Sequence, residues 1–209
     1  MNAGRTATVQ QTAPVRAGHR LDIARAATGL FLARGVERTS LADIADAAGI
    51  PASTLWSHFP SKEECVTPLY SFATERIARR LDTWPPDHPL IDAFDAFDGE
   101  DWLTPTGPSG EETLRAILDA LRLTREEPSL HTLWIRESFA ALPLVARAIA
   151  ARSGRSEPGM DATVQAGMLL SALQLALRAY AWTPPEERHA DLVETLLEAV
   201  RIAMRGLPA

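Results

Sequence analysis

Start and stop signals for short helices follow one another closely in the first third of the chain, and they limit the fold more than any other feature. Apolar side chains at helical spacing mark a first helix, which Gly35 ends in the left-handed conformation. Thr39 or Ser40 caps a second helix, which Gly49 ends. Pro51 begins a third, of about eight residues, because proline suits the first turn of a helix. Three short helices joined by tight turns are therefore expected before residue 60.

Helical patterns continue to the end of the chain, and no segment alternates in the manner of a strand. Ser61-Lys62-Glu63-Glu64 is a capping box that predicts a long helix to about residue 81. Five prolines between residues 85 and 108 predict an irregular connection, with room for a short helix near 90–97. Further helices are predicted over 109–126, 128–152 with a kink at Pro143, 161–182 and 185–206. The predicted fold class is all-α, with about nine helices.

Composition excludes several classes of protein. Apolar residues make up 46% and charged residues 23%, as in an ordinary soluble globular protein. The single cysteine, Cys65, excludes an intramolecular disulfide framework and a cysteine-based zinc site. A reducing, cytoplasmic setting is expected, with no metal and no cofactor. Polar residues interrupt the apolar stretch 164–182, which favours a buried helix over a membrane span.

Charge is divided unevenly along the chain. The total is −6, yet residues 1–62 carry seven basic and four acidic side chains, or +3, which leaves −9 for the rest. A basic N-terminal part on an acidic body is typical of a nucleic-acid-binding module joined to a domain with another task. Residues 1–19 have no apolar core of the kind that a signal peptide needs, and they are predicted to form a flexible basic arm.

Residues 35–59 match the helix-turn-helix pattern, in which a capped helix, a glycine turn and a second short helix follow one another. At 100° per residue, the second helix places Leu55 inward with Pro51 and Phe59 beside it. Its outer face then carries hydroxyls and one indole, at Ser53, Thr54, Trp56 and Ser57. Small hydroxyls let a helix lie deep in a major groove and bond to base edges or phosphates. The alternative is a helical hairpin within a core, with Trp56 buried.

Short motifs follow one another in a fixed order from Ile23 to Glu64. They are Ala26-Ala27, Leu30-Phe31, Gly35-Val36, Thr39-Ser40, Ile44-Ala45, Ala48-Gly49-Ile50, Thr54-Leu55-Trp56, His58-Phe59 and Ser61-Lys62-Glu63-Glu64. In order and spacing this segment resembles the N-terminal domain of the tetracycline-repressor (TetR) family. The resemblance implies a homodimer that binds a palindromic double-stranded DNA operator through successive major grooves. Together with the helical wheel, it places DNA contacts at Thr39, Ser40, Ala52, Ser53, Thr54, Trp56, Ser57, His58 and Lys62. The last two, His58 and Lys62, are expected to contact phosphates.

Two residues depart from the pattern of that family. Trp56 stands where tyrosine is usual, so an indole N–H, which only donates, replaces a phenolic hydroxyl. Pro51 replaces a usual serine and removes a side-chain cap. His58 has a second interpretation, as a residue packed near Phe59.

The chain is predicted to divide into the arm 1–19, a helix-turn-helix DNA-binding domain 20–61 and a helical ligand-binding and dimerisation domain 62–209. Apolar stripes run along the last two predicted helices. The stripe of the final helix comprises Leu192, Leu196, Ala199, Val200 and Ala203. The TetR resemblance implies that these helices pair across a two-fold axis into a four-helix bundle. Burial of the stripe inside a monomer is the alternative.

Motifs in the C-terminal half are Glu126-Glu127-Pro128-Ser129-Leu130, Trp134-Ile135-Arg136, Ala148-Ile149-Ala150-Ala151-Arg152 and Arg178-Ala179-Tyr180-Ala181-Trp182. They resemble actinobacterial regulators similar to the mycofactocin-system repressor, which are associated with acyl-coenzyme-A-like ligands. This resemblance implies a repressor that a small apolar or acyl-CoA-like effector releases from its operator. Ligand-binding residues are expected at Trp102, Leu118, Leu121, Trp134, Phe139, Gln165, Met168 and Gln174. His131 and Arg136 are further polar candidates, and with Glu137 they equally fit a surface cluster.

Enzyme signatures are missing from the sequence, which contains no HExxH, GxSxG, P-loop or dinucleotide-binding glycine pattern. The chain is therefore not expected to be an enzyme. Cys65 follows the capping box on the first turn of a helix, where the pKa of a thiol can fall. Redox sensing is one interpretation of this cysteine, and a packed small side chain is the other. A helical small-molecule carrier or an enzyme, either without DNA binding, is the competing hypothesis for the whole chain.

Overall fold

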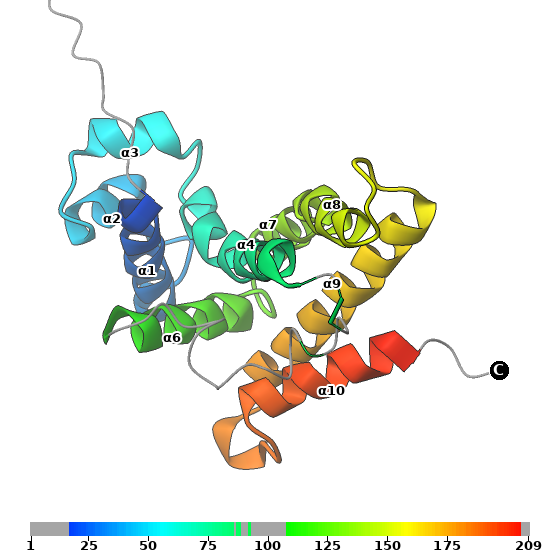
Figure 1. Cartoon of the computed structure of the whole chain (residues 1–209). Coiled ribbons are helices and arrows are strands. Elements are labelled where there is room, and N and C mark those ends of the chain that lie inside the picture. Colours follow the sequence, from blue (N-terminus) through cyan, green and yellow to red (C-terminus); the bar gives the residue numbers. More distant parts are fainter. Residues whose placement is uncertain (1–16, 86, 89–91, 93–107, 206–209) are drawn as a thin grey trace, which may run out of the picture.

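The computed structural model describes residues 17–85, 87–88, 92 and 108–205. Its first three helices, which form the head of the molecule, are α1 (Ala17–Arg34), α2 (Leu41–Ala47) and α3 (Ala52–His58). The helix α4 (Thr67–Thr83) leads from the head into the rest of the molecule (Figure 1). There follow α6 (Pro108–Leu123), α7 (Pro128–Ala140), α8 (Leu142–Arg152), α9 (Met160–Trp182) and α10 (Leu192–Arg205). These residues form nine α-helices and no strand, which confirms the predicted all-α fold.

Local signals of the sequence determine the head. Gly35 and Gly49 adopt φ values of +85° and +66° where α1 and α2 end, as their positions predict. At the start of α2, the Ser40 N–H donates to Asp43 Oδ2 over 2.8 Å, and the Asp43 N–H donates to Ser40 Oγ over 3.2 Å. This reciprocal capping box selects Ser40 as the cap. The hydrogen bonds from Ser40, with Arg34 2.9 Å from the carboxylate, lower the pKa of Asp43 to about 2.

The predicted capping box at residues 61–64 forms only in part. The Glu64 N–H donates to Ser61 Oγ over 3.3 Å, but the Glu64 carboxylate binds Arg136 instead of returning to the backbone of residue 61. The chain makes a 3-10 turn, η1 (Glu63–Val66), before α4 begins. A remote ion pair has therefore replaced a local cap.

Several helix limits differ from the prediction. The first helix begins at residue 17 instead of 20, so three residues of the predicted arm are helical. The segment 128–152 is two helices that meet at Ala141, because Pro143 fits the first turn of α8 but not a helix interior. The last helix begins at Leu192, where the Asp191 carboxylate accepts from the Glu194 N–H over 2.8 Å, and a separate 3-10 turn, η2 (Pro185–Glu187), precedes it.

Two apolar cores meet along α4. The N-terminal core joins the head to α6 and α7 and includes Phe31, Leu55, Leu69, Leu121 and Trp134. The C-terminal core joins the second half of α4 to α8, α9 and α10, with Ile77, Val145, Leu173, Leu196 and Val200. Leu177 of α9 packs against both cores. The N-terminal core therefore crosses the sequence boundary predicted after residue 61, and α4 belongs to both cores.

The helix α9 is long and apolar enough, by length and composition, to cross a membrane. It packs between α8 and α10, with Ala162, Ala166, Leu169 and Leu173 buried, as the interpretation of a core helix predicts. The first sixteen residues of the predicted arm, the predicted short helix near 90–97 except for residue 92, and Trp102 lie outside the described residues.

Candidate nucleic-acid interface and effector cavity

The helix α3 lies at the edge of the head (Figure 1), and most of its polar side chains are exposed. Leu55 and Phe59, which are fully buried, fasten it to the N-terminal core. The indole of Trp56 is 60% exposed, a large fraction for a tryptophan. The remaining outer positions are Ala52, Ser53 and Ser57, all exposed, and the half-buried Thr54. The outer face is therefore the predicted one, and the alternative with a buried Trp56 is wrong.

Pro51 does not pack inward as predicted. It caps α3 from outside the helix, with φ −62° and ψ 137°, and its side chain is exposed. Because α3 begins one residue later than expected, the helical wheel does not extend to this position. The extended backbone at Pro51 instead sets the direction in which the chain enters α3.

Three of the predicted DNA contacts have partners inside the head. Thr39 is buried, and its hydroxyl donates to the Gly35 carbonyl over 2.9 Å, so its side chain does not reach the surface. Ser40 is exposed, but its hydroxyl belongs to the capping box of α2. Lys62 donates from Nζ to the Val36 and Glu37 carbonyls over 2.6 and 3.3 Å. The structure therefore contradicts a DNA contact by the Thr39 side chain, and it gives Lys62 the role of clamping η1 to the turn after α1.

The C-terminal end of α3 holds a histidine and a stacked arginine. His58 is half-buried, and its Nε2 is enclosed without a hydrogen-bond partner in the described part of the chain. The packed interpretation of His58 agrees with this environment better than a phosphate contact does. Arg20 of α1 is exposed, and its guanidinium lies 5.1 Å from the centroid of the Phe59 ring. A positive charge is thereby held beside the end of α3.

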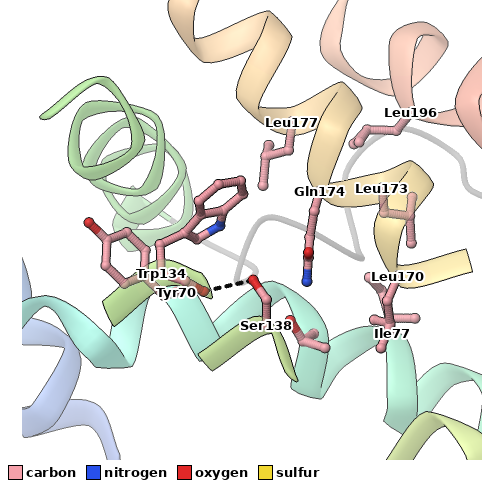
Figure 2. Close-up of a pocket in the computed structure, with 10 residues that line it drawn as sticks. Tyr70, Ile77, Trp134, Ser138, Leu170, Leu173, Gln174, Leu177 and Leu196 are labelled. Atoms are coloured by element: carbon pink, nitrogen blue, oxygen red, sulfur yellow. Dashed lines mark hydrogen bonds between the residues drawn. The ribbon is translucent and has the colours of Figure 1, made fainter. Parts of the chain in front are cut away.

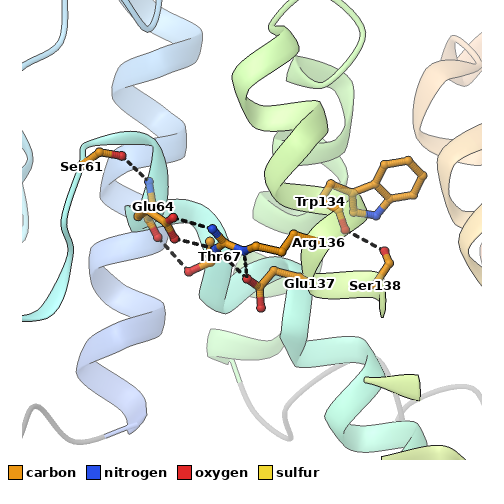
Figure 3. Close-up of polar contacts among 7 residues, drawn as sticks. All are labelled: Ser61, Glu64, Thr67, Trp134, Arg136, Glu137 and Ser138. Atoms are coloured by element: carbon orange, nitrogen blue, oxygen red, sulfur yellow. Dashed lines mark hydrogen bonds and ion pairs between the residues drawn. The ribbon is translucent and has the colours of Figure 1, made fainter. Parts of the chain in front are cut away.

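An ion-pair network connects α7 to the start of α4. Arg136 donates from both terminal nitrogens to the Glu64 carboxylate, over 2.7 Å each, and also contacts Glu137 at 2.8 Å (Figure 3). Glu64 and Glu137 are largely shielded, with side chains 19% and 20% exposed, while Arg136 is 51% exposed. The guanidinium lowers the pKa of Glu64 below its usual value. This pair, the Glu64–Arg136 bridge, confirms the surface-cluster interpretation of Arg136 and Glu137.

A cavity lies at the seam between the two cores. This seam cavity is an open space of about 430 Å³, bounded by α4, α7 and α9 and by Leu196 of α10 (Figure 2). Its walls come from both cores, with Tyr70 and Trp134 on one side and Ile77, Leu170, Leu173 and Leu196 on the other. A smaller hollow of about 330 Å³ adjoins it and shares Ser138, Leu170 and Gln174. Most of this space is open to solvent: the cavity volume proper is about 30 Å³, and about 80 Å³ in the adjoining hollow, so a small molecule fits only where the seam widens.

The predicted ligand-binding residues separate into three groups. Trp134 and Gln174 line the seam cavity, and Phe139, 70% exposed, lines the adjoining hollow. Gln165 and Met168 line a different open hollow, of about 1140 Å³, where α8, α9 and the end of α10 meet. Leu121 belongs to the N-terminal core and Leu118 packs against it, and neither lines the seam cavity or the adjoining hollow. These two leucines, which recur at helical spacing, pack in or against the core of the protein.

Comparison with known proteins identifies the head. Residues 23–69 match the model of bacterial regulatory proteins of the tetR family. The head is therefore similar to the N-terminal domain of that family. The chain is 32% identical over 136 residues to the transcriptional regulator TcmR of Streptomyces glaucescens, an alignment of 62% of this chain and 58% of TcmR. It is 45% identical over 51 residues to the transcriptional repressor KstR2 of Rhodococcus jostii, covering 24% of this chain and 25% of KstR2. The alignments thus span a quarter to somewhat over half of these relatives.

The fold likeness extends over nearly the whole chain. A crystal structure of a putative TetR-family transcriptional regulator from Mesorhizobium loti superposes with a TM-score of 0.52. The two chains are 20% identical, and the match covers 91% of this chain and 98% of the other. The helices that follow the head therefore share the fold of that structure.

Two features of the head and its surroundings are not predicted by the sequence. Arg20 had no predicted role, although its guanidinium lies over the Phe59 ring at the end of α3. The partner of Arg136 was also missed, because Glu64 lies 72 residues away and was assigned to a local cap. The only available signal was an arginine on α7 without a nearby acidic residue other than Glu137.

Proposed function

We propose that the chain is a homodimeric, DNA-binding transcriptional regulator of the cytoplasm, which leaves a palindromic operator when a small apolar molecule occupies the seam cavity. The observation that carries this proposal is the outer face of α3, where Trp56 and two serines are exposed in a domain that matches the TetR family. A carrier protein without DNA binding gives no reason for a 60% exposed indole at this position. The predicted acyl-CoA-like effector remains one version of this proposal.

The two cores suggest how an effector would act. The helix α4 packs in both cores, and the seam cavity lies where they meet. A molecule that widens the seam displaces α4 and α7 relative to the C-terminal core, and the head follows because it shares its core with both helices. Effector and operator then bind with opposing effects, with a coupling free energy of about 1–3 kcal/mol in typical allosteric proteins.

Dimerisation through α9 and α10 is part of the proposal, but by different residues from those expected. Leu192, Leu196 and Val200 of the predicted stripe are buried within one protomer. Exposed apolar side chains instead follow the other faces of these helices, at Met160, Val164, Met168, Leu175, Ile202 and Met204. Exposed apolar residues in this number favour an interface between copies. A two-fold axis there would present two α3 helices to half-sites about 34–36 Å apart.

A binding assay with a single charge change tests the DNA interface. An operator is selected from a random duplex library and compared with DNA flanking the gene, and its affinity is measured by fluorescence anisotropy at several salt concentrations. Wild-type affinity should fall steeply with salt, since phosphate contacts release counterions. Ser53→Glu should lose at least about tenfold in affinity, because it brings a carboxylate to the phosphates.

The matched control is Ser156→Glu, which makes the same charge change at an exposed position between α8 and α9. It should bind the operator as the wild type does. Equal affinities of the two variants, or a failure of the library to yield any duplex with salt-dependent binding, would contradict DNA recognition through α3.

A further inference from the structure

The seam cavity has an apolar body and two polar side chains that make no hydrogen bond within the described part of the chain, Thr74 and Gln174. Trp134, Ile77, Leu170 and Leu173 supply most of its wall. The Trp134 ring is held from outside by Arg178, whose guanidinium lies 5.5 Å from its centroid and 5.1 Å from that of Trp182. The wall on this side is therefore a fixed aromatic surface, against which a flat apolar molecule can stack.

Of these two, Gln174 is the one that offers both a donor and an acceptor. Figure 2 shows its side chain extending from α9 into the space beside Ser138. Within the described part of the chain the half-buried amide of Gln174 makes no hydrogen bond. Two neighbouring hydroxyls already donate, Tyr70 to the Ala120 carbonyl over 3.1 Å and Ser138 to the Trp134 carbonyl over 2.7 Å. Gln174 therefore offers a ligand both a free N–H donor and a free carbonyl acceptor.

The polar groups that line the cavity are all uncharged among the described residues. They are hydroxyls and one amide, from Tyr70, Thr74, Ser138 and Gln174, and the adjoining hollow adds Ser171. A carboxylate or phosphate that enters such a space loses its water without gaining a cation, which costs several kcal/mol. A ketone or hydroxyl enters at much lower cost, because the Gln174 amide replaces the hydrogen bond that it made with water.

We propose that the seam cavity, as its helices move apart, binds an uncharged, largely apolar ring compound whose carbonyl or hydroxyl group pairs with the amide of Gln174. The proposal rests on the proposed function, whose effector class it names. Gln174 is then the residue that determines specificity: it selects molecules with a hydrogen-bonding group from hydrocarbons of the same shape. Free fatty acids, whose carboxylate would enter the same space, are disfavoured, and an acyl-CoA is compatible with it only if the CoA phosphates stay outside.

Prodan, an uncharged naphthalene ketone, is a suitable probe because its emission moves to the blue in apolar surroundings and to the red when its carbonyl accepts a hydrogen bond. The wild type should bind it saturably. In Gln174→Leu the Kd of prodan should rise about two- to tenfold, which corresponds to the net free energy of one neutral hydrogen bond. The emission of bound prodan should also move further to the blue. Gln174→Glu keeps the size of the side chain and removes the amide donor, so it should weaken prodan in the same way.

The matched control is Gln165→Leu, the same change on α9 at an exposed position that lines a different hollow. Its prodan affinity and emission should equal those of the wild type, and circular dichroism melts show whether each variant is folded. The proposal is overturned if prodan does not bind, if the Gln174 and Gln165 variants bind it equally, or if lauric acid displaces it more tightly than a neutral ketone does. The assay contains no DNA, and Ser53→Glu should bind prodan normally, so failure of this proposal is distinct from failure of DNA recognition.

Discussion

Removal of the Glu64–Arg136 bridge should destabilise the protein by a measurable and salt-dependent amount. Two hydrogen bonds of 2.7 Å join the pair in the bidentate geometry that favours arginine with a carboxylate. Because Glu64 is largely shielded while Arg136 is half exposed, the pair belongs at the upper end of the range for surface ion pairs, about 1 kcal/mol. For a chain of this length, that free energy corresponds to a shift of about 2–4 °C in melting temperature.

The two single variants should differ. Glu64→Gln removes one carboxylate and leaves Arg136 paired with Glu137. Arg136→Gln leaves two shielded carboxylates without their common cation, so it should cost more stability than Glu64→Gln. The folded pKa of Glu64 is lowered, so the bridge stabilises above the ordinary glutamate pKa, about 4.3, and this contribution is lost as the pH falls through the folded value. The difference between wild type and Arg136→Gln should therefore narrow below about pH 4.

A double-mutant cycle in urea at neutral pH measures the pair directly. The wild type, both single variants and the double variant should give a coupling free energy of about 1 kcal/mol, which shrinks in high salt. A coupling within about 0.3 kcal/mol of zero, in low salt, would refute the reasoning, because the contact would then contribute nothing beyond its separate residues.

Three further outcomes are expected. Val164→Asp should convert a dimer to a monomer in analytical ultracentrifugation, whereas Leu32→Asp, an equally exposed apolar position on α1, should leave the dimer intact; a dimeric Val164→Asp variant would contradict the α9–α10 interface. The thiol of Cys65 should react with Ellman's reagent only on unfolding, since burial raises its pKa to about 12, and rapid reaction of the native protein would show the redox interpretation to be right. In the wild type, the free energy of unfolding in urea should fall between about pH 4 and 2, because the folded pKa of Asp43 is about 2 and its carboxylate stabilises the protein above that window. In Asp43→Asn this fall should be smaller. Equal pH dependence in the two proteins would count against the capping box.

The parts of the fold that depend on neighbouring residues could be predicted from the sequence. Gly35 ends α1 with a positive φ, and Ser40 and Asp43 form their capping box, because both signals act within one helical turn. The outward direction of Trp56 followed in the same way from its spacing to Leu55. Periodicity of one short helix was enough for the face that carries the proposed DNA contacts.

Contacts between distant segments could not be predicted. The sequence does not show that Glu64 binds Arg136 in preference to its own cap, nor that Lys62 reaches the Val36 carbonyl. The residues that line the cavity could not be predicted for a related reason. Leu121 and Trp134 are both apolar residues of the N-terminal core, and only the packing of α6 and α7 decides that Trp134 also lines the cavity while Leu121 does not.

The helix α7 connects the seam cavity with the head through two of its faces. Trp134 and Ser138 are four residues apart, so they lie on nearly the same side of the helix, toward the cavity. Arg136 lies about 200° from Trp134 around the axis and binds Glu64 on the other side. A molecule in the cavity that rotates or shifts α7 must therefore also move or break the bridge to η1, directly before α4. It follows that Glu64→Gln should leave prodan affinity unchanged, while any effect of a cavity ligand on operator affinity should become smaller in that variant.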